Sequence, residues 1–119
     1  MVKIYKEFVF DSAHFLPNVP HGHPCRHMHG HTYRMKIWIS GEPDPQTGWL
    51  MDFGDLKKHV QPILTLMDHR VLNEISGLEN PTAENISIWV WQKLKPLLPS
   101  LALVELHETP TTGVIYEGN

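Results

Sequence analysis

The sequence has few of the residues that mark a secreted, membrane-bound or nucleic-acid-binding protein. It contains a single cysteine among 119 residues, so no disulfide can form within the chain, which is usual in a reducing compartment. Its formal net charge is −3, without the basic surplus typical of proteins that bind DNA or RNA. No apolar run approaches the roughly 20 residues that a membrane-spanning helix needs. We therefore expect a cytoplasmic protein with neither a membrane nor a nucleic acid as partner.

The N-terminal stretch MVKIYKEFVF also lacks the unbroken apolar run of a secretory signal. Its apolar residues alternate with Lys3, Lys6 and Glu7, a pattern typical of a strand. The length fits one domain over residues 1–119. A core of this size is often supplemented by an oligomer interface.

Hydrophobic periodicity divides the chain into six elements. Four segments alternate with the period of two that strands show: residues 2–13, 29–40, 101–108 and 114–117. Two segments follow helical spacing: from Asp52 to Met67, and from Ile86 to Leu97. The order β–β–α–α–β–β predicts an α+β fold with one antiparallel sheet and two helices on one of its faces.

Prolines and small polar residues set the expected helix limits. Pro62 should kink the first helix or shorten its regular part. Asn80 or Thr82 can cap the second helix, with Pro81 in its first turn, and Pro96 then ends it.

Three histidines share the inward face of the predicted sheet. His29 and His31 are two residues apart, so one strand directs both to the same side. His14 continues the apolar face of the first strand beyond Phe8 and Phe10. A single histidine at a strand end is usually unremarkable, but the three together favour metal binding. Three neutral imidazoles with an open fourth position form the ligand set of a catalytic zinc site.

Cys25 lies four residues before His29 in the segment PCRHMHGHTY, and its spacing leaves three interpretations open. It could be a fourth metal ligand that closes a structural site. It could be an acid/base beside the metal, because a nearby cation favours the thiolate. It could also be a small buried residue without a chemical role.

Two further clusters carry titratable groups. Asp68 and His69 end the first predicted helix, where a histidine is common because of the helix dipole, or where a carboxylate can orient an imidazole for proton transfer. Glu108 continues the inward face of the third strand. It either emerges into solvent or meets a ligand whose paired N–H groups compensate for its burial.

Taken together, the motifs resemble the 6-pyruvoyltetrahydropterin synthase family, which is built on the tunnelling fold, and the resemblance runs nearly end to end. The motifs are FDSAH at 10–14, C-x3-HGH at 25–31, GWLMDF at 48–53, LMDH at 66–69, LENPTAEN at 78–85 and HET at 107–109. The short length and the GLENPT segment resemble the bacterial branch that forms 6-carboxytetrahydropterin for queuosine synthesis.

The resemblance implies a role for each candidate residue. By the family pattern, His14, His29 and His31 would bind zinc, and Cys25 would be a general acid/base that does not bind the metal. The pair Asp68 and His69 then acts as a proton relay on the opposite side of the substrate. Glu108 would bind the edge of the pterin ring that carries the 2-amino group and N3.

The resemblance also implies the reaction and the assembly. The substrate would be 7,8-dihydroneopterin triphosphate, and the products 6-carboxytetrahydropterin, acetaldehyde and triphosphate, without a redox cofactor. The chain would form a homohexamer of two stacked trimers, with active sites at subunit interfaces where the relay pair faces a neighbour's zinc.

Three alternatives stay open. The first is 6-pyruvoyltetrahydropterin synthase activity on the same substrate. The second is aldol cleavage to hydroxymethyl-dihydropterin, a branch in which a glutamate typically replaces the cysteine. The third, from another class, is a zinc-stabilised binding module without chemistry. Arg26, His27 and Pro110 depart from the family pattern, and Arg26 and Lys6 are candidates for binding the triphosphate.

Overall fold

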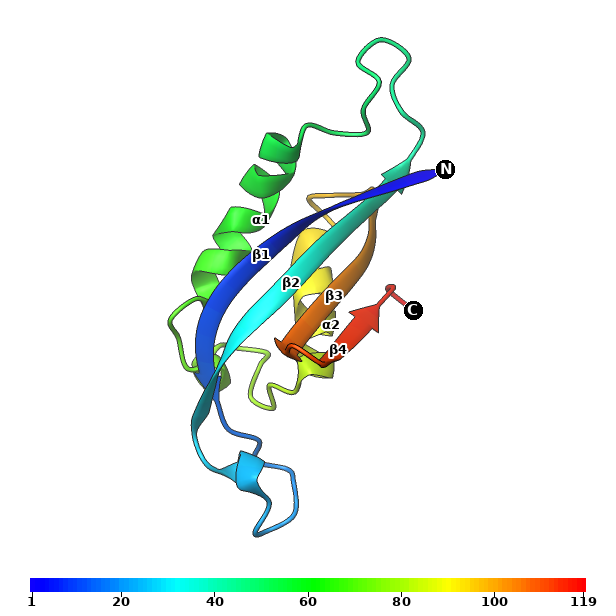
Figure 1. Ribbon diagram of the computed structural model, residues 1–119. Coiled ribbons are helices and arrows are strands. Elements are labelled where there is room, and N and C mark those ends of the chain that lie inside the picture. The colour runs from blue at the N-terminus through cyan, green and yellow to red at the C-terminus, as the bar shows by residue number, and fades with distance from the viewer.

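The computed structural model describes residues 1–119 and contains one four-stranded antiparallel sheet with both α-helices on the same face (Figure 1). The elements are β1 (Val2–His14), β2 (His29–Gly41), α1 (Phe53–Met67), α2 (Ala83–Leu94), β3 (Leu101–Thr109) and β4 (Thr112–Tyr116). Two short 3₁₀ helices, η1 (Pro24–Arg26) and η2 (Leu72–Glu74), lie in the connections. The strands are ordered β1-β2-β3-β4, so the predicted α+β class and order of elements are confirmed. No helix is both long and apolar enough to span a bilayer.

The long pairing of β1 with β2 forms one side of the sheet. It runs from Val2 opposite Gly41 to His14 opposite His29. β3 joins β2 only from Arg34 onward. The end of the β1–β2 pair that carries the histidines therefore extends beyond the rest of the sheet as a two-stranded ribbon (Figure 1).

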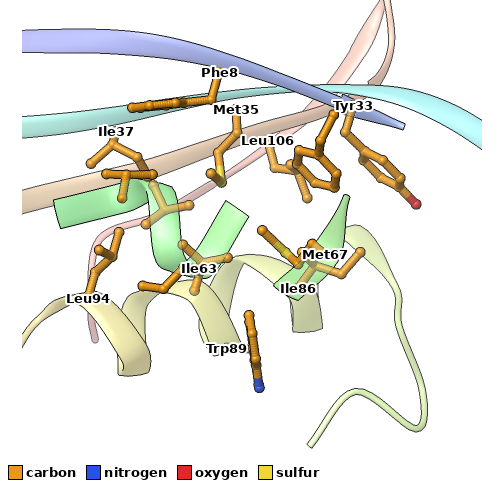
Figure 2. Close-up of a cluster of buried hydrophobic side chains, with 14 of the residues drawn as sticks. Phe8, Tyr33, Met35, Ile37, Ile63, Met67, Ile86, Trp89, Leu94 and Leu106 are labelled. Atoms are coloured by element: carbon orange, nitrogen blue, oxygen red, sulfur yellow. The ribbon is translucent and has the colours of Figure 1, made fainter. Parts of the chain in front are cut away.

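The core lies between the sheet and the two helices. Alternation directs side chains of β1, β2 and β3 toward the helices, where they meet the apolar faces of α1 and α2 (Figure 2). The labelled contributors are Phe8, Tyr33, Met35, Ile37 and Leu106 from the sheet, and Ile63, Met67, Ile86, Trp89 and Leu94 from the helices. Burying each large apolar side chain stabilises the fold by roughly 1.5–3 kcal/mol.

The first helix excludes one of the two effects predicted for Pro62. The proline does not shorten α1, which continues to Met67, the end that the helical spacing predicted. A proline removes one backbone hydrogen bond and crowds the preceding turn. Ile63 and Met67, which follow it, are 5% and 0% exposed, and their burial offsets that cost.

The second helix begins and ends slightly differently from the prediction. Thr82 is the N-cap, and its side chain accepts a hydrogen bond from the Asn85 N–H at 3.1 Å. Pro81 precedes this cap instead of standing in the first turn. The helix ends at Leu94, so Leu97 lies beyond it and is 59% exposed, contrary to its predicted place in the apolar stripe.

The third strand departs from simple alternation. Trp38 pairs with Leu103 but Ile39 pairs with Leu101, so Ala102 is an extra residue in β3. Such a bulge shifts the face to which the following side chains point. Leu101 is therefore buried and Ala102 only half-buried, the reverse of the predicted pattern.

The cap of α2 gives a prediction about stability. Replacing Thr82 with alanine removes the acceptor for the Asn85 N–H, so the free energy of unfolding should fall by about 0.5–2 kcal/mol in urea titrations. Thr111→Ala, in the exposed turn between β3 and β4, is the matched control and should leave the stability unchanged. Equal stability of the two variants would show that the cap contributes nothing.

Candidate functional site

The register of β1 against β2 brings three histidines together. His14 stands opposite His29, and Ser12 stands opposite His31. The ligand atoms that His14, His29 and His31 can offer all lie within 4.8 Å of one another. The ring centroids are 4.6 to 5.1 Å apart. We call these three residues the histidine cluster.

Backbone carbonyls orient two of these rings. Nδ1 of His14 lies 2.8 Å from the carbonyl oxygen of Pro81, and Nδ1 of His29 lies 2.7 Å from that of His27. A carbonyl oxygen only accepts, so both Nδ1 atoms carry the proton and donate it. The lone pair of each ring is then on Nε2, which is the nitrogen that can bind a metal. Metal-binding histidines commonly donate the N–H of their other ring nitrogen to a backbone carbonyl in this way.

The histidine cluster fits a divalent metal ion because one of its buried nitrogen atoms has no hydrogen-bond partner. Nε2 of His14 is buried and has no hydrogen-bond partner, and the residue is only 1% exposed. A buried polar atom without a partner is costly, and a metal ion would satisfy this one. Burial lowers the pKa of His14 and of His31, and the neighbouring His29 lowers both further. Low pKa values favour the neutral imidazole that binds metal.

A pocket of about 400 Å³ opens beside the cluster and contains further predicted residues. Its walls are His14, Leu16, Pro24, Cys25, His29, His31, Glu108 and Thr109. The structure thus gathers five of the seven candidate residues, while Asp68 and His69 line no part of this pocket. Lys6 and Arg26, the candidates for binding triphosphate, are also absent from its walls.

Cys25 lines this pocket but is not among the residues whose ligand atoms could share a metal ion. It lies in the short helix η1 and is half-buried as a free thiol. The group of side chains whose ligand atoms approach closely enough to share an ion consists of the three histidines alone. This geometry favours a thiol that faces the ligand space over one that closes a structural metal cage.

Glu108 lies near the end of β3 and is half-buried. Burial raises the pKa of its carboxyl group, His29 opposes that shift, and Glu84 adds to it. The residue also lines a pocket of about 270 Å³ with Arg34 and His107, and one of about 180 Å³ with Glu84. Its carboxylate therefore stands where several cavities meet, as a recognition group for a ligand would.

Asp68 and His69 form a preorganised pair on another side of β1. Nδ1 of His69 lies 2.9 Å from Oδ1 of Asp68, which also accepts the N–H of Asp11 at 3.1 Å. The bond from Asp11 is the main cause that lowers the pKa of Asp68. His69 has a φ of 57°, a left-handed conformation that few residues other than glycine adopt, and its N–H donates to the carbonyl of Asp11.

The pair opens toward a different cavity. This pocket of about 530 Å³ is lined by His69, Arg70 and parts of β1 and β2, and His31 is the only residue that it shares with the pocket of Cys25. Within one chain, the structure therefore does not bring Asp68 and His69 into the pocket that holds Cys25 and Glu108.

Three residues that support the site were not indicated by the pattern of the sequence. Tyr33 is a core residue whose hydroxyl lies 3.3 Å from Nδ1 of His14, and burial keeps its pKa far above the ordinary value. Pro81 was assigned to a helix turn, yet its carbonyl holds His14. Asn73 accepts the N–H of Phe15 at 3.0 Å and donates to its carbonyl at 2.8 Å, next to His14. All three act across 19 residues or more, and no local pattern reveals such contacts.

The cluster gives a prediction about metal content. Removing a group that merely orients a ligand costs 10–100-fold in metal affinity, so His29→Ala should lower the affinity for Zn²⁺ more than about 100-fold. Competition with a chromophoric chelator measures this. His59→Ala, on α1 and outside the cluster, should bind Zn²⁺ as the unmodified protein does. Equal affinities in the two variants would remove His29 from the ligand set.

Comparison with known proteins identifies the family of this chain. The family described as 6-pyruvoyl tetrahydropterin synthase matches residues 3–119. The chain is 40% identical to the 6-carboxy-5,6,7,8-tetrahydropterin synthase of Synechocystis over 95% of its length and 91% of the relative. It is 37% identical to the dihydroneopterin monophosphate aldolase of Pyrococcus furiosus, covering 91% and 90% of the two chains. The structure of 6-pyruvoyl tetrahydropterin synthase from Caenorhabditis elegans superposes with a TM-score of 0.91 at 29% identity, covering 99% and 96%. The chain belongs to the 6-pyruvoyl tetrahydropterin synthase family.

Proposed function

We propose that this chain converts 7,8-dihydroneopterin triphosphate and water into 6-carboxytetrahydropterin, acetaldehyde and triphosphate. The observation that carries the proposal is the pocket in which Cys25 and Glu108 stand beside the histidine cluster. The 40% identity to the Synechocystis synthase supports the choice of product. We further infer that the product serves queuosine synthesis and that the reaction takes place in the cytoplasm, where a free thiol stays reduced.

Glu108 recognises the pterin ring in this proposal. The adjacent 2-amino and N3–H groups of a pterin present two parallel donors, and an ionised carboxylate presents two acceptors. Because Glu108 is half-buried and its pKa is raised, its paired hydrogen bonds with the ring replace lost contacts with water. This fixes one end of the substrate and directs its three-carbon side chain along the pocket.

The histidine cluster holds the metal, which we propose to be zinc. Three neutral imidazoles leave a position open for substrate, as in catalytic zinc sites. When bound, zinc polarises the hydroxyl groups of the substrate side chain and lowers their pKa. Backbone carbonyls hold Nδ1 of His14 and of His29, which leaves Nε2 of both rings free to bind the ion.

Cys25 and His69 move the protons. The thiol of Cys25 exchanges a proton with the side-chain carbon on one face, while Nε2 of His69 exchanges one on the other. Asp68 holds Nδ1 of His69 at 2.9 Å and keeps the ring in one orientation. The carbon–oxygen bond to triphosphate breaks with the electron pair leaving on the triphosphate. The side-chain carbon next to the ring is oxidised to a carbonyl as the ring gains two electrons. Water then adds to this carbon, and cleavage of its bond to the next carbon leaves the carboxylate, while the departing two-carbon fragment takes up a proton and is released as acetaldehyde.

The assembly follows from where the proton-transfer pair lies. His69 lines a cavity apart from the pocket of Cys25, which supports a site that takes the proton-transfer pair from a second copy. We propose a homohexamer of two stacked trimers, in which each active site combines residues of different chains. β1 and β4 are the edge strands of the sheet and offer unpaired backbone groups for joining neighbouring copies.

Two related activities are alternatives to this proposal. The Caenorhabditis elegans structure is of a 6-pyruvoyl tetrahydropterin synthase, and the Pyrococcus furiosus relative is named an aldolase. Cys25 favours the synthases, because a glutamate typically takes its place in the aldol-cleaving branch. The two synthases differ in whether the side chain is cleaved, so the product decides between them.

Product analysis is the direct test. Zinc-loaded protein given 7,8-dihydroneopterin triphosphate should release one acetaldehyde for each 6-carboxytetrahydropterin, as measured by mass spectrometry. A product that keeps all three side-chain carbons would replace the proposal with the pyruvoyl activity, and hydroxymethyl-dihydropterin would replace it with aldol cleavage. In Cys25→Ala, turnover should fall by about 10²–10⁴-fold while zinc and assembly are retained. Joint loss of zinc and stability in this variant would instead favour a zinc-stabilised binding module.

Mixing two inactive variants tests the shared active site. Cys25→Ala and His69→Ala each remove one partner of the proton transfer, so each alone should be inactive. After joint unfolding and reassembly in equal amounts, about a quarter of the sites combine an intact Cys25 with an intact His69 from another chain. Turnover should recover to about that fraction of the unmodified enzyme. No recovery in a mixed oligomer, verified by native mass spectrometry, would place both residues of a site in one chain.

A further inference from the structure

The loop that carries Cys25 has little regular structure to hold it. It connects β1 to β2 at the end of the long ribbon (Figure 1) and contains Pro17, Pro20 and Pro24. A proline has no backbone N–H, so these positions cannot donate to a hydrogen-bonded ladder. The conformation of the loop must come from other contacts.

The guanidinium group of Arg26 makes two of these contacts. Its Nη1 donates to the carbonyl of Pro17 at 3.0 Å and to that of Val19 at 2.7 Å, seven to nine residues earlier in the chain. One side chain thereby ties the end of the loop back to its beginning.

Cys25 lies directly beside this closure. Its carbonyl accepts the N–H of Leu16 at 2.7 Å, and its own N–H donates to Nδ1 of His23 at 3.1 Å. Leu16 and Cys25 are both walls of the pocket at the histidine cluster. Any opening between the Leu16–Val19 segment and η1 would therefore move the thiol relative to the histidines.

We propose that Arg26 is a positioning residue for Cys25: by binding the carbonyls of Pro17 and Val19, it closes the loop and holds the thiol in the pocket. The proposal rests on the proposed role of Cys25 as the acid/base. Arg26 is absent from the walls of the pocket, so it acts through the loop and does not contact the substrate in this chain.

Arginine is suited to this position for a physical reason. Each terminal nitrogen of the planar guanidinium has two hydrogens in fixed, diverging directions, and both are used here on carbonyls two residues apart. The positive charge of the guanidinium strengthens both hydrogen bonds. A lysine has a shorter stem and no fixed fork, so it would restore the closure only in part.

The single cysteine allows a direct measurement of this closure. Cys25 is the only thiol that iodoacetamide can alkylate, and peptide mapping separates this product from slower reaction at other side chains. At about pH 9.5, above the ordinary pKa of a thiol, the rate reports exposure more than ionisation. In Arg26→Met, alkylation followed by mass spectrometry should be several-fold faster than in the unmodified protein. Arg26→Lys should lie between the two. Lys57→Met, which removes a positive charge from the exposed face of α1, should match the unmodified protein.

Steady-state kinetics on the zinc-loaded enzyme complete the test. A small displacement of a reacting group costs up to about 100-fold in rate, so Arg26→Met should lower kcat by roughly 10–100-fold. KM should change little because Glu108 and the metal still hold the substrate, and zinc content should be unchanged. Partial recovery of kcat in Arg26→Lys supports positioning by the two hydrogen bonds.

The outcomes separate this proposal from the proposed function. The proposal would be overturned if Cys25 in Arg26→Met were alkylated at the same rate as in the unmodified protein and kcat were also the same. It would equally be overturned if the variant were less stable but its alkylation rate and kcat were unchanged. The unmodified protein could instead make no pterin product while Cys25 is alkylated faster in Arg26→Met and more slowly again in Arg26→Lys. In that case Arg26 does close the loop, and only the proposed reaction is wrong.

Discussion

The pairing of β1 with β2 in a single register is the constraint on which the site depends. Phe8 and Phe10 in β1 face the core together with Tyr33 and Met35 in β2, and a slip by one residue would turn one of these apolar faces toward water. The same register places His14 opposite His29 at the end of the ribbon. Burial of the core therefore specifies the position of the histidine cluster, although none of its members contributes to the apolar cluster itself.

The free side of β1 receives a second set of bonds near His14. The N–H of His69 donates to Asp11, the N–H of Ala13 donates to Arg70, and Ala13 forms a parallel bridge with Val71. The segment after α1 thus runs along β1 on the side that β2 does not occupy. One strand consequently fixes the histidine cluster and the Asp68–His69 pair relative to each other, while directing them to different cavities. A rigid arrangement of this kind is what the proposed assembly requires, because each copy would then present both groups at fixed positions.

Most of the fold was predictable because period-two and helical spacing follow directly from how side chains leave a strand or a helix. The shared face of His14, His29 and His31 followed from the same rule. The role of Cys25 did not, because loop residues have no period, and bonds such as those of Arg26 to Pro17 and Val19 depend on the folded path of the loop. The extra residue Ala102 also escaped prediction, and Pro62 does not end α1, because packing around both residues outweighs the local preference.

The division between strand and loop has a chemical reason. Metal ligands must keep their geometry before the ion arrives, since a buried Nε2 such as that of His14 has no other partner to direct it. Paired strands and backbone carbonyls supply that rigidity. In the proposed reaction the thiol instead approaches substrate carbon without binding the metal. Cys25 lies on a closed loop beside the cluster but outside the group of possible ligands, so one pocket has room for the proposed metal, the proposed acid/base and the substrate.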